Sequence, residues 1–182
     1  MTRLVLVRHG RAAAGFGEHV DPGLDEVGRR QAAAAAEALA GLTPRPILTS
    51  PLRRARETAE PLEARWRTSA TIAPDVGEIP SPTDDLGARS RWLEGVLSQR
   101  WSAVDPLLRS WRAGVIDFLT DLAADSVVFT HFVVINVAVG SATGDDRIVC
   151  CHPANAGRTV LAVEDGRLQL VEAAAEGSTE VL

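Results

Sequence analysis

The stretch Leu4-Val5-Leu6-Val7-Arg8-His9-Gly10, near the start of the chain, decides the fold. A short apolar run that ends in polar residues is typical of a strand buried inside a parallel sheet. Such a strand delivers the residues that follow it to the carboxyl edge of the sheet, and in open α/β sheets ligands bind outside that edge. Arg8 and His9 are therefore candidate functional residues.

Strand and helix patterns alternate along the rest of the chain. We expect further strands over 47–49, 71–73, 126–130, 147–151, 159–163 and 168–171, and helices over 24–40, 51–65, 89–99, 106–124 and 133–139. Ser50 and Pro51 have the residue types of a helix cap and a first helical position. Asp165-Gly166 is typical of a hairpin turn. The alternation predicts an α/β protein, a three-layer α/β/α sandwich around a mostly parallel sheet, with one domain over 1–182.

The composition is that of an ordinary globular chain, and it excludes several classes of enzyme. The chain has 182 residues, of which 46% are apolar and 24% charged, and its net charge is −5. All 19 basic residues are arginine, and neither lysine nor tyrosine occurs. Schiff-base enzymes, P-loop nucleotidases and protein kinases each need a lysine and are excluded. The acidic balance argues against nucleic acid as a partner.

No segment of the sequence indicates export or a membrane partner. No apolar run approaches the ~18 residues of a membrane helix, and the run after Met1 is too short for a signal peptide. We therefore expect a cytoplasmic location.

Two adjacent cysteines, Cys150 and Cys151, lie in the predicted strand 147–151. Neighbours on a strand point to opposite faces, so a disulfide between them would be strained. We expect two small buried apolar residues in a reducing compartment. A metal site with His152 is not expected, because three consecutive residues cannot easily converge on one ion.

Three polar clusters follow predicted strands: Arg8-His9-Gly10, Thr49-Ser50 with the arginines after it, and Thr130-His131. Because such strand ends meet at one edge of a sheet, two histidines and several arginines could lie together. One histidine after a strand is usually an ordinary loop residue, but three coincident clusters favour a functional site.

These clusters resemble motifs of the histidine phosphatase superfamily, which includes the cofactor-dependent phosphoglycerate mutases. Four motifs occur in the family's order: Arg8-His9-Gly10; Asp21-Pro22-Gly23-Leu24 with Gly28 and Gln31; Ser50-Pro51-Leu52-Arg53-Arg54-Ala55 with Thr58 and Ala59; and Val127-Val128-Phe129-Thr130-His131. The resemblance implies a phosphoglycerate-mutase-like sandwich around a mixed sheet. The chain length fits the small phosphatase branch of the family.

The resemblance also implies a role for each candidate residue. His9 would be the nucleophile that takes the phosphoryl group as a phosphohistidine. Arg8 and Arg54 would bind the phosphoryl oxygens, and His131 would be a further donor to them. Glu78 resembles the carboxylate that serves many members as general acid toward the leaving oxygen, and Asp84, Asp85 and Glu94 are alternatives.

These roles are coherent on physical grounds. Adjacent guanidinium groups disfavour protonation of an imidazole, which must be neutral to attack. The same groups neutralise the charge of a phosphoryl group in transfer. A poor alkoxide leaving group needs a proton, which a carboxylic acid can supply. Water then hydrolyses the phosphohistidine, so we expect neither a metal nor a cofactor.

Other residues lie near the motifs without belonging to them, or depart from the family pattern. Arg11, next to the signature, could contact the substrate. His19 and His152 have no motif support and are expected to be loop or surface residues. Ala12 stands where the family often has serine or threonine, and Gly157 where serine is frequent.

The segment 74–104 is expected to be a lid or a substrate-specificity insertion within the domain. It carries Trp92 and Trp101. These tryptophans could pack on the sandwich, which we expect of at least one of them, or form an aromatic wall of the phosphate pocket.

The sequence therefore predicts a metal-independent phosphomonoesterase, a phosphoric monoester hydrolase that acts through a phosphohistidine on His9. Its partner would be a small phosphorylated substrate. Three alternatives stay open: a phosphoglycerate-type phosphomutase, a protein phosphohistidine phosphatase, and a non-catalytic binder of phosphorylated ligands. The compact chain argues against the mutase, and the intact motifs argue against loss of catalysis. The natural substrate and the oligomeric state are not indicated.

Overall fold

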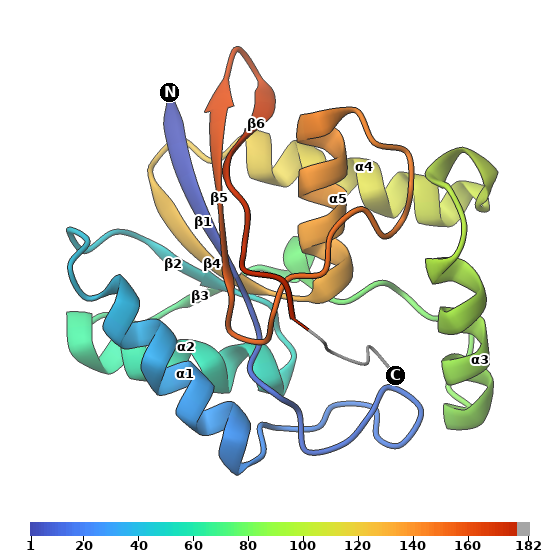
Figure 1. The fold of residues 1–182 in the computed structure, drawn as a ribbon, viewed down its shortest axis with the longest axis horizontal. Helices are drawn as coiled ribbons and strands as arrows, with labels where there is room; N and C mark the ends of the chain where they lie inside the picture. The colour runs from blue at the N-terminus through green and yellow to red at the C-terminus, as the bar shows by residue number, and fades with distance from the viewer. Residues whose placement is uncertain (178–182) are drawn as a thin grey trace.

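The computed structural model describes residues 1–177, and their strands form one six-stranded sheet in the order β3-β2-β4-β1-β5-β6 (Figure 1). The strands are β1 (Thr2–Arg8), β2 (Ile47–Thr49), β3 (Thr71–Ile72), β4 (Ser126–Thr130), β5 (Arg158–Glu164) and β6 (Arg167–Glu172). The first four run parallel to one another, and β5 and β6 are antiparallel to their neighbours. The sheet is thus mixed, with its four parallel strands at the centre and one edge.

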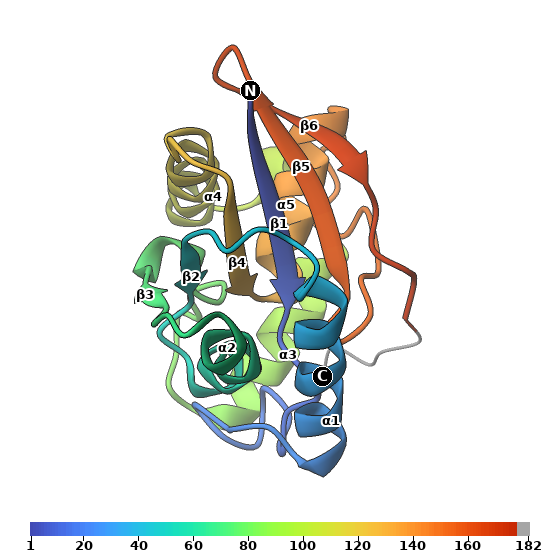
Figure 2. The same ribbon diagram turned by 90° about the vertical axis from the view of Figure 1, so that its left-hand side faces the viewer.

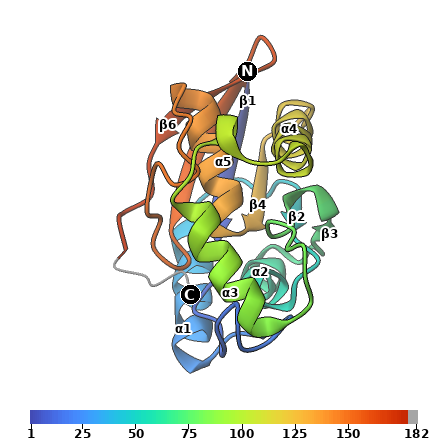
Figure 3. The ribbon, with the colours of Figure 1, turned by 90° about the vertical axis from the view of Figure 1, so that its right-hand side faces the viewer.

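Helices cover both faces of the sheet, so the predicted three-layer sandwich is confirmed (Figure 1). They are α1 (Glu26–Leu39), α2 (Arg53–Trp66), α3 (Leu86–Leu97), α4 (Pro106–Thr120) and α5 (Phe132–Thr143), with short 3₁₀ turns at Pro74–Val76 and Trp101–Ala103. Helices α1 and α2 lie on the face seen in Figure 2, and α3, α4 and α5 lie on the opposite side, seen in Figure 3.

Two apolar cores hold the layers together, and β1 contributes to both. Leu4 and Leu6 point into the core shared with α4 and α5, while Val5 and Val7 point into the core shared with α1 and α2. This alternation follows from the two-residue period of a strand. Trp101 is buried in the first core, so the expected packing of a tryptophan of segment 74–104 on the sandwich is confirmed.

The predicted strand at 147–151 is wrong. Its apolar residues made it read as a strand, but the segment forms an irregular loop beyond α5. The amide oxygen of Asn136 accepts the backbone N–H groups of Cys150 (2.8 Å) and Cys151 (2.9 Å). Because a buried side chain satisfies these donors, Cys150 and Cys151 need no partner strand, and the pairing of the segment is limited to an isolated bridge between Arg147 and Arg100.

The predicted start of the second helix is also wrong, since α2 begins at Arg53 and its cap position is Leu52. Ser50 instead lies against the ring of His131, with 2.7 Å between its hydroxyl oxygen and Nε2. The same hydroxyl oxygen accepts from the backbone N–H of Leu52 (3.2 Å), so Ser50 serves a turn just before the helix and a partner far along the chain.

The other elements agree with the sequence to within a few residues. Asp25 and Asp85 cap α1 and α3 by accepting backbone N–H groups, so α3 begins three residues earlier than expected. The hairpin turn is confirmed, since Asp165 and Gly166 have φ values of 50° and 70°, which a type I′ turn requires. Within residues 1–177, the helices are all too short or too polar to cross a membrane.

Candidate active site

The register of the parallel strands brings the three polar clusters together at one edge of the sheet. In the β1–β4 pair Arg8 lies opposite Thr130, and in the β2–β4 pair Thr49 lies opposite Phe129. The residues that follow these strand ends therefore meet, as the sequence predicts. His9 and His131 are neighbours there, with their ring centroids 5.2 Å apart.

The hydrogen bonds of His9 define its tautomer. Nδ1 lies 2.8 Å from the carbonyl oxygen of Gly10, which can only accept, so Nδ1 carries the proton. Nε2 accepts from Nε–H of Arg54 at 3.3 Å. Burial, with Arg54, His131 and Arg8 adding to it, holds the pKa of His9 well below its ordinary value. The ring is therefore neutral at neutral pH, and its lone pair lies on Nε2.

Several contacts fix the backbone of the His9 loop. The carbonyl oxygen of His9 accepts from the side-chain amide of Asn155 (3.1 Å) and from the backbone N–H of Ala156 (3.3 Å). The N–H of Gly10 donates to the hydroxyl of Thr58 (3.0 Å). A Cβ at Gly10 would lie 2.6 Å from a backbone oxygen of α1, so only glycine fits there.

Arg8 is buried and held on two sides. One guanidinium nitrogen donates to the carbonyl oxygen of Pro153 (2.8 Å), and the group lies 5.0 Å from the centre of the Phe132 ring. Burial, reinforced by Arg54 and opposed by Glu78, lowers the pKa of Arg8 to about 10. The side chain is thus positive at neutral pH and lines the cavity described below.

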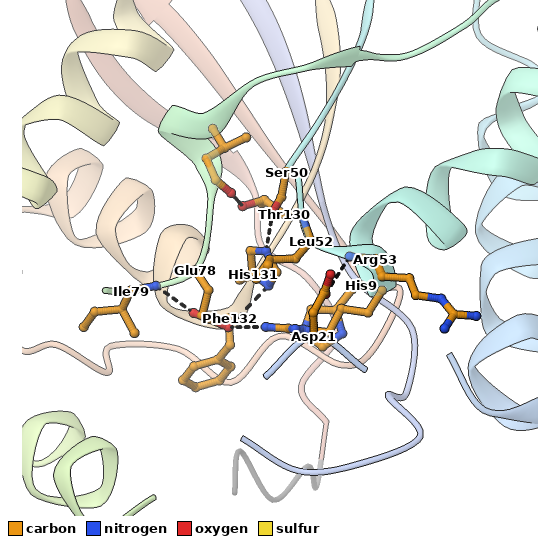
Figure 4. A network of polar contacts seen from close by, with 12 residues as sticks. His9, Asp21, Ser50, Leu52, Arg53, Glu78, Ile79, Thr130, His131 and Phe132 are labelled. Atoms are coloured by element: carbon orange, nitrogen blue, oxygen red, sulfur yellow. Dashed lines mark hydrogen bonds and ion pairs between the residues drawn. The ribbon is translucent and has the colours of Figure 1, made fainter. Parts of the chain in front are cut away.

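Arg54 connects the nucleophile candidate to the carboxylate. Its Nε–H donates to His9, and its second terminal nitrogen lies 3.2 Å from Oε2 of Glu78. The same carboxylate oxygen lies 3.3 Å from Nδ1 of His131, and its partner oxygen accepts from the N–H of Ile79 (Figure 4). One planar guanidinium therefore spans both groups.

His131 lies fully buried between Glu78 and Ser50 (Figure 4). Nδ1 lies 3.3 Å from the Glu78 carboxylate and Nε2 lies 2.7 Å from the hydroxyl oxygen of Ser50, so the ring bridges the two groups. Burial lowers the pKa of His131, and Glu78 offsets this only in part.

Glu78 is ionised at neutral pH. Burial by itself raises the pKa of this carboxyl, but His131 and Arg54 outweigh burial and hold the pKa well below its usual range. A general acid must hold a proton. Glu78 in this charge state therefore cannot act as the general acid that the resemblance implies.

A cavity of about 650 Å³ opens over these groups. Arg8, His9, Arg54 and Glu78 form its floor, and the loop 10–23, α3 and α5 form its walls. The loop is attached to α3, because the guanidinium of Arg89 lies 4.4 Å from the centre of the Phe16 ring.

The remaining sequence candidates occupy different places. Arg11 lines the cavity and pairs with Asp25 at 2.5 Å, and His19 lines its exposed rim. His152 is an exposed loop residue, as expected. The alternative acids stand outside the cavity lining: Asp84, Asp85 and Glu94.

Sequence reasoning missed the residues that position the site. Ser50 and Thr58 lie within the motifs given above, where only a capping role is predicted for Ser50, and Asn155 lies two residues before Gly157. Their side chains hold His131, Gly10 and the carbonyl of His9. The only local signal is their polar residue type, because each of them holds a residue far away in the sequence.

His9, Glu78 and His131 could in principle hold a metal ion, since their ligand atoms lie within 4.8 Å of one another. Arg54, however, contacts both His9 and Glu78, and Arg8 lies beside them. Two guanidinium groups disfavour a divalent cation and favour an anion. The arrangement therefore fits a phosphoryl group.

Comparisons with known proteins agree with this chemistry. A model of the histidine phosphatase superfamily (branch 1) matches residues 4–176. A stretch of 67 residues is 45% identical to a glucosyl-3-phosphoglycerate phosphatase of Mycolicibacterium vanbaalenii, and it covers 35% of this chain and 30% of that relative. The chain thus matches less than a third of that protein's length.

Solved structures share the fold. The native mycobacterial glucosyl-3-phosphoglycerate phosphatase matches with a TM-score of 0.71 and 22% identity, over 97% of this chain and 100% of that one. A phosphoserine phosphatase from Entamoeba histolytica, in complex with 3-phosphoglyceric acid, matches over 100% of both chains with a TM-score of 0.74 and 20% identity. Because the family model covers nearly the whole chain, the protein belongs to the histidine phosphatase superfamily, branch 1.

Proposed function

We propose that this protein is a phosphomonoesterase that works through a phosphohistidine on Nε2 of His9, and that residues 1–182 form one domain for this purpose. The observation that carries the proposal is a buried, neutral imidazole whose lone pair faces Arg54 at 3.3 Å, with Arg8 lining the same cavity. A neutral nucleophile beside two fixed positive charges suits attack on a phosphate dianion.

The reaction proceeds in two displacements. Nε2 of His9 attacks the phosphorus atom, an N–P bond forms, and the ester P–O bond breaks as the leaving oxygen takes a proton. Water then attacks the phosphorus and gives a proton to the Glu78 carboxylate, the N–P bond breaks, and His9 returns to its neutral state with release of inorganic phosphate. Arg8 and Arg54 bind the phosphoryl oxygens throughout, where positioning and charge provide most of the catalysis.

Glu78 becomes the general acid only when the phosphoryl group is present. Its low pKa depends on Arg54 and His131. Phosphoryl oxygens compete with Glu78 for Arg54, which lines the cavity, and add negative charge nearby, and each effect raises the pKa of the carboxyl. Glu78 then holds a proton for the leaving oxygen.

The outer half of the cavity favours an uncharged, partly apolar leaving group. Phe16, Leu93 and Val133 line it. Among the described residues of this half, Arg11 is the permanently positive side chain, and Asp25 already neutralises it. Glu18 adds a negative charge at the rim. We therefore propose a small phosphomonoester without a carboxylate as substrate, with Leu93 of segment 74–104 contributing to its specificity.

A matched pair of substrates tests this choice. Glycerol 3-phosphate and 3-phosphoglycerate differ mainly in a hydroxymethyl group against a carboxylate. We expect kcat/KM to be higher for glycerol 3-phosphate by about tenfold, which corresponds to roughly 1.4 kcal/mol of charge repulsion. Glu18→Gln removes the negative charge at the rim, so it should reduce the difference in kcat/KM between the two substrates. Preference for 3-phosphoglycerate would overturn the substrate assignment and leave the phosphatase assignment intact.

Variants of the two key residues test the mechanism itself. His9→Ala should abolish hydrolysis of every ester in a panel. Glu78→Gln should slow alkyl phosphates strongly and aryl phosphates little, because an aryl oxide leaves without a proton. Full activity of His9→Ala would exclude the proposed route.

One alternative is disfavoured by the position of Glu78. A phosphatase for protein phosphohistidine needs less help from an acid and suits an open, shallow pocket. Here a carboxylate lies 3.2 Å from Arg54 at the floor of a cavity of about 650 Å³. This arrangement supports esters as substrates.

A further inference from the structure

Cys150 and Cys151 form a pair of free thiols beside the site, and the proposed mechanism does not use them. Both side chains are half-buried. The sulfur of Cys150 lies 3.5 Å from the backbone oxygen of Asn136, and the sulfur of Cys151 lies 3.4 Å from the side-chain oxygen of the same residue. The two thiols therefore converge on one residue, which they could not do on a strand.

The backbone under this pair is held in place. Asn136 is fully buried in α5, and its amide nitrogen donates to the carbonyl of Phe132 (3.0 Å). Its amide oxygen accepts the N–H groups of both cysteines. Two thiols on a fixed backbone lose little conformational freedom when they bind one atom, which favours a chelate.

The thiols also influence each other. Interaction between them lowers the pKa of Cys150 and raises that of Cys151. A lower pKa at one sulfur favours formation of its bond first, and the neighbouring thiol can then form the second bond to the same centre.

The pair is connected to the phosphate-binding residues through the next two residues of the chain. Pro153 accepts the hydrogen bond from the guanidinium of Arg8. The ring of His152 lies 6.0 Å from that of Phe132, on which Arg8 also rests. Pro153 follows Cys151 by two residues, so an adduct on the thiols that displaces Pro153 would alter the hydrogen bond of Arg8.

We propose that Cys150 and Cys151 form a vicinal dithiol site for a soft, thiophilic centre, trivalent arsenic in particular, and that occupation of this site weakens phosphate binding through Pro153 and Arg8. Soft thiolate ligands select such centres. A disulfide suits the pair less well, because adjacent Cα atoms are about 3.8 Å apart and disulfides usually span about 4.4–6.8 Å.

The chemistry requires no oxidant. With phenylarsine oxide, both thiols lose their protons, two S–As bonds form, and the oxygen of the reagent leaves as water. Arsenic remains trivalent throughout.

Intact-protein mass spectrometry tests the site. Wild-type protein should retain one phenylarsine group per chain after washing with a monothiol, and should release it to a small dithiol such as 2,3-dimercaptopropanol. Cys150→Ser and Cys151→Ser should each lose the adduct in the monothiol wash. Retention by either single variant, or no adduct on the wild type, would overturn the dithiol site.

Binding of inorganic phosphate, measured by calorimetry, tests the connection to Arg8. The arsenical should weaken phosphate binding to the wild type by about tenfold, the scale of one charge-assisted hydrogen bond. It should leave phosphate binding to the Cys150→Ser/Cys151→Ser double variant unchanged. Equal phosphate affinity of loaded and unloaded wild type would overturn the connection. Neither measurement depends on turnover of a substrate. A protein without phosphatase activity could therefore still bind the arsenical, and the two proposals can fail independently.

Discussion

At the scale of single residues, the tautomer of His9 decides what the site can do. The carbonyl of Gly10 holds the proton on Nδ1, which leaves the lone pair on Nε2, the atom that attacks phosphorus in the proposed mechanism. Burial and the neighbouring positive charges keep the ring neutral. A protonated imidazole could not attack phosphorus. Burial and the neighbouring positive charges therefore both lower the pKa of His9 and keep its ring able to act as a nucleophile.

The first prediction concerns the charge of His9 as the pH falls. Its pKa is lowered, so the proton binds only at a pH below the ordinary histidine value of about 6.5. At about pH 6 we expect His9 to remain neutral with its proton on Nδ1. Nitrogen-15 NMR of histidine-labelled protein, assigned with His9→Gln, measures this. A cationic His9 at that pH would contradict the account of the site.

The second prediction separates Arg54 from its neighbour in the motif. Arg54→Lys removes the planar fork that reaches both His9 and Glu78, because lysine presents a single point charge. We expect kcat/KM for p-nitrophenyl phosphate to fall roughly 10- to 100-fold, the scale of one charged hydrogen bond. Arg53→Lys is the matched control and should act like the wild type, since Arg53 pairs with Glu57 on the surface of α2. An equal loss of kcat/KM in both variants would contradict the assignment of Arg54 as the phosphate-binding arginine of this motif.

At the scale of elements, strand ends and helix starts place the site residues. The strand patterns at 47–49 and 126–130 predicted β2 and β4, and the register of parallel strands then required the polar clusters to meet. Local patterns failed where a side chain serves a partner far along the chain. Ser50 looked like a helix cap but binds His131, and 147–151 looked like a strand but is held by Asn136. Neither partner can be read from neighbouring sequence.

The charge of Glu78 could not be predicted either. The sequence identified a candidate carboxylate in a polar loop, and the resemblance suggested its role. Its pKa depends on distances to Arg54 and His131, which come from α2 and the end of β4. Only the assembled fold brings these charges within 3.3 Å.

The third prediction tests the packing of α1 against the His9 loop. A Cβ at Gly28 would lie 2.1 Å from the backbone oxygen of Arg11, so the loop would have to shift. We expect Gly28→Ala to lower the free energy of unfolding by about 1–3 kcal/mol, in the range of overpacked sites. Gly95→Ala is the control, because nothing lies within 4 Å of a Cβ there. In the interior of α3 it should stabilise by about 0.5–1 kcal/mol. Urea denaturation measures both, and a neutral Gly28→Ala would show that the loop does not need this close approach.

At the scale of the whole molecule, an acidic protein holds a small positive cavity. The net charge is −5, and all 19 basic residues are arginine. Most of these arginines pair with carboxylates on the surface or lie in solvent, whereas Arg8 and Arg54 are buried at the carboxyl edge of the sheet. The lack of lysine therefore removes nothing that this chemistry needs.

The fourth prediction follows from this charge distribution. Phosphate should bind the folded protein through Arg8 and Arg54, and ligands that bind only the folded state raise the free energy of unfolding. At a phosphate concentration of about 100 times its Kd, the free energy of unfolding should rise by about 2.7 kcal/mol. Thermal unfolding with and without phosphate measures this gain. Arg8→Met should lose most of it, while Arg30→Met, on the exposed surface of α1, should keep it. Equal gains in both variants would place phosphate binding elsewhere.

The central claim is that the phosphoryl group passes through His9, and trapping the intermediate tests it most directly. Wild-type protein is mixed with a phosphorus-32-labelled ester for milliseconds and quenched in alkali, in which phosphohistidine is stable. The account predicts protein-bound label that survives alkali, is lost in acid, and maps to the peptide containing His9. Thr58→Ser retains the hydroxyl that contacts Gly10 and should be labelled normally, and His9→Ala should carry no label. Label on another residue, or unchanged turnover by His9→Ala, would contradict the account.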